Sequence, residues 1–480
     1  MNIKTFKGEK FPLELHKVRV VQKLNFPPLK RRVKSLQEAG YNMFLLKNDD
    51  IFLDMLTDSG VNAMSDNQIA AMNQADDSYA GSATYFRLEK VVLEFFNKKY
   101  FLPTHQGRAC EHILAKVFVK PGNAVPMNYH FTTTKAHITE VGGVVEQFFL
   151  NEALISDSKN PFKGNMDLSL LEDYLDKHAA NVPFVRMEAG TNLIGGQPWS
   201  LDNYEKVSKI CRDHHILLVL DASLLSDNLY FIKTREEAYK DASIKEILTK
   251  ISDLSDIIYF SARKLSFSRG GGIVTSNLAA YEAMRPLVPL YEGFLTYGGM
   301  SIREMEAMAV GLNETYDFDI ISQGPIFIKY MVDELDKLGV PVVKPAGGLG
   351  CHLDVAKFIP HVNHHQYPAE ALGSALYLVG GIRGMERGTL SEQRDSLGVE
   401  PESEVELLRL ALPRRVFTMS QIKYAIDRIY WLYQHRELIG GLEWVMEPEV
   451  LRFFYGTLRP IGGWENKLIK VLKKDLGQEE

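Results

Sequence analysis

Two residues with chemically useful side chains each follow an apolar stretch of the sequence. Lys264 comes shortly after the stretch 257–260, and Asp221 comes directly after the stretch 216–220. Apolar runs rich in β-branched and aromatic residues are typical of buried strands in parallel sheets. Ligands of open α/β sheets bind at the carboxyl ends of such strands. Because each residue follows its own strand, we expect Lys264 and Asp221 to face one crevice.

A lysine and an aspartate held in this way suit pyridoxal phosphate. The lysine can form a Schiff base with the cofactor, and the aspartate can keep the pyridine nitrogen protonated, so that the ring acts as an electron sink. A buried carboxylate also needs a cationic or hydrogen-bonding partner. On spacing alone, an ordinary ion pair, a strand-end cap or a solvated lysine is the simpler explanation.

Three further segments carry groups that the same cofactor or an amino-acid substrate would use. Gly107 and Arg108 begin an apolar-periodic helix, whose free N–H groups and positive dipole end favour an anion such as phosphate. Asn192 follows another strand, where its amide could bind a ring hydroxyl. Arg409 lies in the apolar stretch 408–413, and a buried arginine needs a substrate carboxylate or a structural acid. Each signal is weak alone, but all four point to one cofactor.

The elements that must position these residues follow an alternating pattern. Strands are predicted at 182–187, 216–220 and 256–260, and helices at 84–97, 109–119, 201–214 and 236–250. Such alternation favours an α/β fold with a mostly parallel sheet and helices on both faces. The glycines at 270–272 allow a tight return of the backbone after Lys264.

The two ends of the chain are expected to form a second, smaller domain. A helix ended by Gly40, short strands at 44–46 and 51–53, and a linking helix from Ile302 toward Asp317 are predicted. The C-terminal part mixes helices at 327–337 and 421–435 with strands near 342, 351–355 and 407–411. We therefore predict an N-terminal arm and part of the small domain at 1–55, a large domain at 56–315, and the rest of the small domain at 316–480.

Bulk composition excludes several classes of protein. The 480 residues are 45% hydrophobic and 24% charged, as in ordinary soluble globular proteins. A net charge of −6 and a pI near 6.2 argue against a nucleic-acid partner. The three cysteines are far apart and lack metal-binding spacing, which fits a reducing compartment. No signal-peptide core or membrane-length apolar run is present, so we expect a cytoplasmic protein that does not bind membranes.

Long sequence landmarks give the chain a resemblance to a known family. They are LTDSGVNAMSD at 56–66, YAGS at 79–82, THQGR at 104–108, FTTT at 131–134, GGQP at 195–198, YEG at 291–293, YGG at 297–299 and MEAM at 305–308. From residue 39 to residue 454 the sequence resembles the β-eliminating lyases that depend on pyridoxal phosphate, the tyrosine phenol-lyase and tryptophanase family. The resemblance implies a fold-type-I, aspartate aminotransferase-like enzyme, with a smaller α+β domain beside the large one.

The resemblance also implies the residues that contact the cofactor. Lys264 would form the Schiff base and act as the base at the substrate α-carbon. Asp221 would pair with the pyridine nitrogen, Phe131 would stack on the ring, and Asn192 would lie near the ring oxygen. The phosphate and its surroundings would be held by Gln106, Gly107, Arg108, Glu111 and Ser261.

Substrate roles follow from the same resemblance. Arg409 would bind the substrate carboxylate, and Tyr79, contributed by a neighbouring subunit, would protonate the leaving group. MERG at 385–388 is close to the tyrosine phenol-lyase version, in which Arg387 and Thr132 orient the phenolic oxygen. The rest of the pocket would be lined by Thr57, Phe44, Met385, Phe453 and Phe454, although aromatic side chains of this kind are also ordinary core residues.

The implied activity is carbon–carbon bond cleavage by β-elimination. A tyrosine-like aromatic L-amino acid would give pyruvate, ammonia and the released arene, in a homodimer or homotetramer with shared active sites. One alternative is a diverged pyridoxal phosphate enzyme, performing β-substitution, C–S cleavage or transamination on another amino acid. A further alternative is a non-catalytic protein that binds pyridoxal phosphate.

Several positions depart from the family pattern. Ser223 and Leu224 stand where the family carries Thr-Arg, and the loss of that cation near the ring oxygen should alter the cofactor's electronics. Arg263 replaces the usual lysine before Lys264, which conserves charge but not geometry. The family's potassium site would lie near Gly60, Asp77 and Arg269, where the resemblance leads us to hypothesise that Arg269 replaces the ion and pairs with Asp77.

A histidine cluster is the other candidate for a metal site. His361, His364 and His365 lie between Pro360 and Pro368, with no cysteine or carboxylate close by in sequence. Prolines on both sides are typical of a loop. We expect no metal site in this loop, because its ligand set is incomplete.

Overall fold

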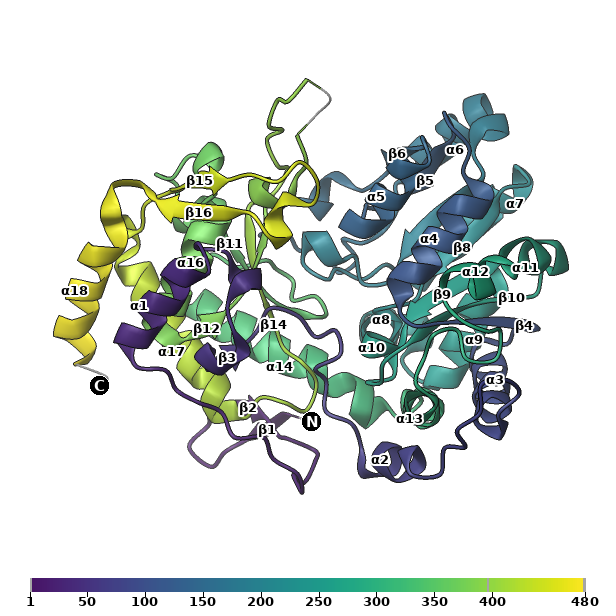
Figure 1. The fold of residues 1–480 in the computed structure, drawn as a ribbon, viewed down its shortest axis with the longest axis horizontal. Helices are drawn as coiled ribbons and strands as arrows, with labels where there is room; N and C mark the ends of the chain where they lie inside the picture. The colour runs from purple at the N-terminus through teal and green to yellow at the C-terminus, as the bar shows by residue number, and fades with distance from the viewer. Residues whose placement is uncertain (1, 395–396, 478–480) are drawn as a thin grey trace.

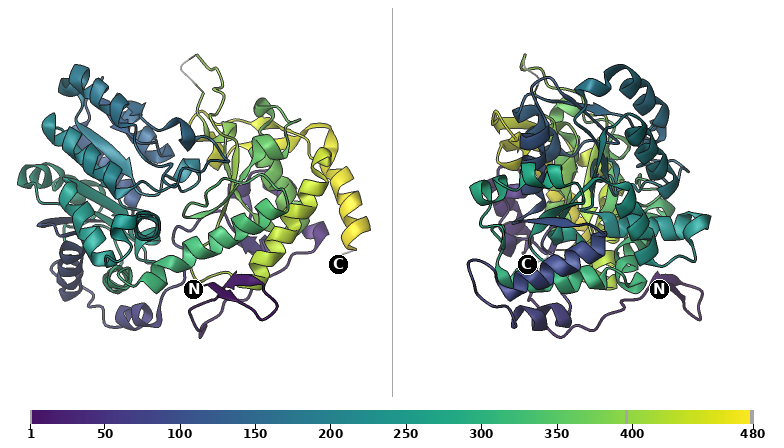
Figure 2. Two further views of the ribbon diagram at one scale, coloured as in Figure 1. Left: turned by 180° about the vertical axis from the view of Figure 1, so that it is seen from behind. Right: turned by 90° about the vertical axis from the view of Figure 1, so that its right-hand side faces the viewer.

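The chain folds into two parts that lie side by side (Figure 1). The computed structural model describes residues 2–394 and 397–477. One part is built on a seven-stranded sheet, and the other carries both the N-terminal strands and the C-terminal helix (Figure 1, Figure 2). Within the described ranges, no helix is both long and apolar enough to cross a membrane.

The central sheet is mostly parallel, as the alternating pattern predicts. Its strands in spatial order are β4 (Tyr100–Thr104), β10 (Gly271–Thr275), β9 (Ile257–Ser261), β8 (Leu217–Asp221), β7 (Phe184–Glu188), β5 (Ala124–Met127) and β6 (Val144–Gln147). β10 is antiparallel to both of its neighbours, and the pairs from β9 to β6 are parallel. The register places Glu188 opposite Asp221 and Asp221 opposite Tyr259.

Alternation along the strands creates a core on each face of this sheet. In β8, Leu218 and Leu220 belong to one buried cluster, and Val219 belongs to the other. The same alternation in β9 separates Phe260 from Tyr259. The covering helices are α2 (Asp66–Met72), α3 (Ala83–Phe96), α4 (Gly107–Phe118), α5 (Thr132–Glu140), α6 (Leu168–His178), α7 (Leu201–Asp213), α8 (Leu225–Arg235), α9 (Ile244–Leu254), α10 (Ala262–Leu265), α11 (Leu278–Met284), α12 (Leu287–Tyr291) and α13 (Ile302–Glu314).

The smaller part has its own sheet and core. β11 (Gly350–Asp354), β14 (Leu407–Ala411) and β13 (Met385–Arg387) form an antiparallel sheet in that order. Minor pairs join β12 (Ile382–Arg383) to β3 (Leu53–Asp54), β15 (Leu442–Met446) to β16 (Thr457–Pro460), and β1 (Asn2–Lys4) to β2 (Lys10–Pro12). The helices are α1 (Leu29–Glu38), α14 (Phe318–Lys337), α15 (Val355–Phe358), α16 (Pro368–Gly380), α17 (Met419–Gln434) and α18 (Trp464–Leu476).

The core of the smaller part combines segments from both ends of the chain. Leu36 and Leu53 belong to the same buried cluster as Leu372, Leu408 and Leu468. The chain crosses between the two parts after Leu56 and again from α13 to α14, and it does not return to the sheet. The domain boundaries at residues 55 and 315 stay a prediction.

Some predicted elements differ from those observed. The strand predicted at 44–46 is a 3₁₀ turn, Met43–Leu45, because the Asn42 side chain accepts the N–H of Phe44 at 2.8 Å. The helix predicted at 236–250 begins later than predicted, because a capping box between Ser243 and Glu246 starts α9 at Ile244. Sequence patterns also missed β4, β5 and β6. β4 and β5 each contain a proline, which weakens a strand signal.

Candidate active site

A cavity of about 340 Å³ lies between the two parts and contains nearly all the predicted site residues. Its wall from the sheet part includes Gln106, Gly107, Arg108, Glu111, Phe131, Thr132, Asn192, Asp221, Ser261 and Lys264. Its wall from the smaller part and the connecting segment includes Phe44, Thr57, Met385, Arg387, Arg409, Phe453 and Phe454. The cavity is thus assembled from residues 44 to 454, which meet only in the folded chain.

Lys264 lies inside this cavity rather than in solvent. It belongs to the single turn α10, which begins directly after β9. Its side chain is 13% exposed, and its Nζ is 4.0 Å from Oδ1 of Asp58. The same Nζ lies 5.9 Å from the centre of the Phe131 ring. The interpretation of Lys264 as a solvated strand-end residue is therefore wrong.

Asp221 has the buried cationic partner that its position requires. Arg186 donates from Nη2 to Oδ2 of Asp221 at 2.6 Å, and the Tyr259 hydroxyl donates to the same oxygen at 2.9 Å. The N–H of Ser223 donates to the other oxygen, Oδ1, at 3.0 Å. Arg186 is fully buried on β7, two residues before Glu188. These contacts give the carboxyl group on the cavity wall the cationic and hydrogen-bonding partners that its burial requires.

The opposite end of the cavity is built for an anion. Gly107 begins α4, and the side chain of Gln106 does not cap the free N–H groups of this helix. A Cβ on Gly107 would lie 2.9 Å from Cβ of Ser261, so only glycine lets α4 approach β9 this closely. Arg108 and Arg263 both line this region. Burial, and then the nearby charge of Arg269, lower the pKa of Arg263. A phosphate dianion between the arginines would relieve this repulsion.

Two buried arginines of the smaller part face the same cavity. Arg409 donates from Nη1 to Oδ1 of Asn192 and from Nη2 to the carbonyl of Leu56, each at 2.8 Å, while its Nε has no partner. Arg387 is 4% exposed, and its Nε and Nη1 have no hydrogen-bond partner among the described residues. Burial lowers the pKa of Arg387 to about 10. Unpartnered guanidinium groups of this kind favour anionic or strongly polar ligand groups.

An aromatic cluster lines the cavity close to Arg108 of the anion site. The ring of Phe44 lies 5.6 Å from that of Phe453 and 4.9 Å from that of Phe454. All three rings line the cavity, and Arg108 lies 6.0 Å from the centre of the Phe454 ring. A flat aromatic group could pack against such edge-to-face rings.

Among the predicted catalytic, cofactor-binding and substrate-binding residues, Tyr79 is the one that lies outside its own chain's cavity. It is 72% exposed and packs against the rings of Phe294 and Tyr297, with centroids 5.9 and 5.4 Å away. The N–H of Gly81 ties this segment to Thr296 at 2.9 Å. Tyr79 can therefore act only in the cavity of another copy of the chain, as the resemblance implies, or after a rearrangement.

Known proteins similar in sequence to this chain belong to the family that the sequence landmarks indicate. The family described as beta-eliminating lyase matches residues 54–427. The chain belongs to the beta-eliminating lyase family. A tyrosine phenol-lyase of Pasteurella multocida is 40% identical over 453 residues, which are 94% of this chain and 99% of the relative. A tyrosine phenol-lyase of Lacrimispora saccharolytica is 41% identical over 458 residues, or 95% and 98% of the two chains. A tryptophanase of Salinibacter ruber is 39% identical over 449 residues, or 93% and 95%.

Solved structures show that this beta-eliminating lyase has the predicted fold. A serine palmitoyltransferase of Sphingomonas wittichii superposes with a TM-score of 0.56 at 12% identity, covering 80% of this chain and 88% of that chain. A structure titled "SPT with PLP, N100Y" superposes with a TM-score of 0.58 at 12% identity, covering 86% and 98%. At this identity the likeness concerns the fold alone, and the predicted fold-type-I architecture is confirmed.

Leu224, one of the positions that depart from the family pattern, lies among apolar side chains. Leu224 does not line the lyase cavity, because it packs with Leu349 and Ala411 in a buried cluster. A Cβ on Gly190 would lie 3.1 Å from Cβ of Leu224. Leu224 is therefore held by apolar packing, and the effect of this position on the cofactor stays a prediction.

Arg269 and Asp77, expected to pair, do not form an ion pair in the part of the chain that the structure describes. Asp77 lines a shallow surface pocket beside Arg303, and the backbone N–H of Arg269 donates to Glu304 at 2.8 Å. Arg263 lies closest to Gly60, with its Nη1 3.0 Å from the position that a Cβ there would take. The guanidinium beside Gly60 is thus that of Arg263, and the replacement of potassium by Arg269 stays a prediction.

Two carboxylates from a later segment of the chain approach the histidine loop, which the sequence spacing did not reveal. Nδ1 of His365 lies 3.0 Å from Glu400, and Nδ1 of His364 lies 3.5 Å from Glu402. His361 contacts the carbonyl of Ile439 at 2.8 Å instead. Across the described part of the chain, no group of three or more metal-ligating side chains is suited to a metal ion.

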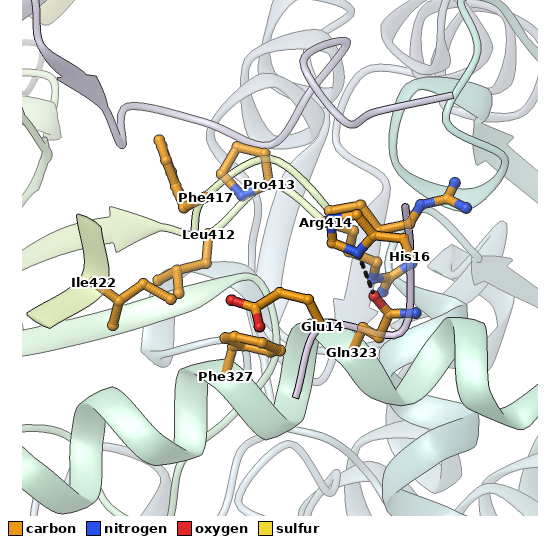
Figure 3. A pocket seen from close by; sticks show the side chains of 11 residues that line it. Glu14, His16, Gln323, Phe327, Leu412, Pro413, Arg414, Phe417 and Ile422 are labelled. Atoms are coloured by element: carbon orange, nitrogen blue, oxygen red, sulfur yellow. Dashed lines mark hydrogen bonds between the residues drawn. The ribbon is translucent and has the colours of Figure 1, made fainter. Parts of the chain in front are cut away.

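A second, much smaller pocket lies away from Lys264. It forms where the N-terminal segment crosses α14, and Figure 3 shows His16 directed at Gln323, with Nδ1 and Oε1 3.3 Å apart. Phe327 and Phe417 close its sides. Its volume of about 20 Å³ holds no more than a water molecule, so it is not a substrate site.

Sequence reasoning missed two charged residues of the site, Arg186 and Glu188. Arg186 had a usable signal, because a lone arginine in an apolar strand needs an anion, as was inferred for Arg409. Glu188 lines the cavity, and its importance depends on the pairing of β7 with β8. Strand pairing of this kind leaves no mark on the spacing of residues in a single sequence.

Proposed function

We propose that this lyase removes the side chain of a tyrosine-like aromatic L-amino acid by β-elimination, giving pyruvate, ammonia and the released arene. The observation that carries the proposal is one cavity that is lined by Lys264 and Asp221, by the start of α4, by an aromatic cluster and by two buried arginines with unpartnered guanidinium nitrogens among the described residues. The relatives named tyrosine phenol-lyase support the choice of an aromatic substrate.

The residues present fit pyridoxal phosphate. The glycine contact at Gly107 and the arginine charges suit its phosphate, and the buried carboxylate of Asp221 suits a pyridine nitrogen. Nδ2 of Asn192 is buried without a partner, so it can donate to a ring oxygen. When bound, the cofactor supplies an electron sink to the substrate α-carbon.

The chain's own residues would then divide the remaining work. Lys264 would hold the cofactor covalently and take the α-proton of the substrate, because it is the one lysine among the described residues that line the cavity. Arg409 binds the substrate carboxylate through its unpartnered Nε. Arg387 and Thr132 bind the polar group on the arene, while the rings of Phe44, Phe453 and Phe454 pack against its faces.

The experiment that tests this proposal is a substrate screen with purified protein. Pyruvate would be measured from tyrosine, tryptophan and S-alkyl cysteines, with Lys264→Ala as the matched variant. We expect pyruvate mainly from tyrosine, and none with Lys264→Ala, which would also lose the covalent cofactor after borohydride reduction. Pyruvate mainly from an S-alkyl cysteine, or a keto acid formed only by transamination, would support a diverged enzyme. No turnover and no bound cofactor would contradict the enzyme proposal entirely.

We also infer that the active form is a homodimer or homotetramer. Tyr79 and Phe294 pack together at the surface, and Leu290 and Tyr291, a few residues before Phe294, are exposed as well. Exposed apolar groups that cluster in this way are typical of protein interfaces. A second copy of the chain is the occupant favoured by the family resemblance, in which neighbouring subunits share their sites.

A further inference from the structure

One buried guanidinium group, that of Arg186, lies directly behind the wall of the cavity. Arg186 is 1% exposed and does not itself line the cavity. It lies in the middle of β7 and pairs with Val219 of β8, two residues before the pair of Glu188 with Asp221. Because side chains alternate along a strand, all four side chains lie on the same face of the sheet. Any effect of Arg186 on a ligand must therefore pass through the side chains that it contacts.

All three nitrogens of the Arg186 side chain have partners. Nη2 donates to Oδ2 of Asp221 at 2.6 Å, Nε donates to the Tyr259 hydroxyl at 2.9 Å, and Nη1 donates to the carbonyl of Tyr129 at 3.4 Å. The Tyr259 hydroxyl donates its own hydrogen to the same Oδ2 of Asp221 at 2.9 Å. These contacts form a closed ring of three side chains, which fixes the orientation of the Asp221 carboxyl group.

This arrangement leaves one oxygen of Asp221 available to a ligand. Oδ2 already accepts two hydrogens, from Arg186 and Tyr259. Among the described residues, Oδ1 accepts only the N–H of Ser223, at 3.0 Å. Each carboxylate oxygen can accept about two hydrogen bonds. Oδ1 therefore keeps one acceptor site on a residue that lines the cavity, which suits the ring nitrogen that Asp221 is expected to bind.

The same guanidinium group also faces a second carboxyl group. Oε2 of Glu188 lies 3.7 Å from Nη1 of Arg186 and has no hydrogen-bond partner in the described part of the chain. Burial raises the pKa of Glu188 to about 8, in spite of the opposing charge of Arg186. Near neutral pH Glu188 is therefore mostly protonated, and Arg186 keeps its hydrogen bond to Asp221. Among the described residues, Arg186 is the one cation within ion-pair distance of Asp221.

We propose that Arg186 is a positioning residue, which holds Asp221 so that its Oδ1 stays available to the ring nitrogen of the cofactor. The proposal rests on the proposed function, in which Asp221 holds a proton on that nitrogen. Without Arg186, the carboxyl group of Asp221 would stay buried beside that of Glu188 with no cation in contact. A carboxylate in such surroundings takes up a proton itself or turns away. In either case the ring nitrogen would lose its partner.

The test replaces Arg186 and follows the ring nitrogen directly. Pyridoxal phosphate that is isotopically labelled at this nitrogen shows by NMR whether the nitrogen carries a proton. We expect a protonated ring nitrogen in the natural protein and an unprotonated one in Arg186→Gln. The kcat of pyruvate formation should fall about 10- to 100-fold, the range found when the outer partner of a site residue is removed. KM should change little, because Arg186 does not line the cavity.

Two further variants keep the test decisive if Arg186→Gln does not fold. Arg186→Lys keeps the positive charge but not the forked contacts, so it should retain part of the rate and of the protonated signal. Arg186→Gln combined with Glu188→Gln leaves fewer buried acids without a cation, and it should show the same loss as the single variant. An unchanged ring nitrogen together with an unchanged kcat, in any of these variants that folds, would overturn the proposal.

The matched control is Arg32→Gln, at a buried arginine in the smaller part. Arg32 is also 1% exposed, and it donates to the carbonyls of Pro27 and Leu378. Both substitutions should lower the thermal stability, but only those at Arg186 should change the signal of the ring nitrogen. An equal change in the control would show a general loss of structure and would also contradict the proposal. If the natural protein binds no cofactor or forms no pyruvate, the proposed function fails instead, which is a distinguishable result.

Discussion

A single buried carboxyl should be visible in the pH dependence of the reaction. Glu188 faces Arg186 on its own strand, Asp221 on β8, Lys264 on α10 and Arg387 on β13. Burial dominates this balance and raises its pKa to about 8, so the group is protonated below that pH and ionised above it. Ionised Glu188 would compete with Asp221 for Arg186, which contacts both carboxyl groups, so the rate of the proposed elimination should decline as the pH rises through about 8.

The measurement is the pH profile of kcat for the proposed elimination in the natural protein and in Glu188→Gln. The rate of the variant should show no decline of this kind, because its side chain does not ionise. An identical decline in the variant would assign the titration to another group.

At the residue scale, the sequence predicted which residues line the site better than it predicted the ion pairs and hydrogen bonds between them. Every predicted catalytic, cofactor-binding or substrate-binding residue except Tyr79 lines one cavity, because motif residues can be recognised one position at a time. The environment of Asp221 could not be recognised in this way. Its partners Arg186 and Tyr259 come from two neighbouring strands, and only the register of those strands brings them together.

At the scale of elements, the contact between helix α4 and strand β9 determines the anion site. Gly107→Ala would place a Cβ 2.9 Å from Cβ of Ser261 and 3.3 Å from its backbone nitrogen. One of the two elements must therefore move, and the N–H groups at the start of α4 would no longer be aimed as before. We expect at least about a 10-fold loss of cofactor affinity, equivalent to one or two weakened charged hydrogen bonds.

Cofactor titration followed by visible absorbance measures this change, with far-ultraviolet circular dichroism to check the fold. Gly373→Ala is a suitable control, since a Cβ there would make only ordinary contacts, 3.4 Å from Leu408 and 3.7 Å from Met43. Equal affinity in Gly107→Ala and the natural protein would show that the anion binds elsewhere.

Element boundaries also show where sequence patterns stop being informative. The strands that end at Asp221 and near Lys264 were predicted within a residue or two, because they are long apolar runs. Strand β4 was missed although it borders the sheet, since Pro103 interrupts its pattern. Proline is tolerated there because β4 pairs with only one neighbour, β10.

At the scale of the whole molecule, the catalytic arrangement depends on contacts between distant parts of the chain. Arg409 and Arg387 come from the sheet of the smaller part, and they meet Asn192 and Glu188 of the larger part across the cavity. The α/β fold could be predicted from alternation alone, but the closeness of these parts could not. Only the family resemblance connected the ends of the chain to a shared pocket.

Association of two copies is the remaining property of the whole molecule that the surface predicts. Phe294 is exposed and packs against Tyr79, and aromatic side chains at a surface are common anchors of interfaces. We expect the natural protein to be a dimer or tetramer at micromolar concentration. Phe294→Asp should weaken association at least about 30-fold, as expected when a central anchor worth about 2 kcal/mol is lost.

Size-exclusion chromatography with light scattering over a range of dilutions measures this association. Leu170→Asp is the matched control, because Leu170 is an exposed leucine on α6 outside the aromatic cluster. The control should associate like the natural protein, while Phe294→Asp should dissociate at higher concentration. A natural protein that is monomeric at all concentrations would contradict shared active sites. It would also leave Tyr79 without a cavity to act on, so that every proton in the reaction must come from within one chain.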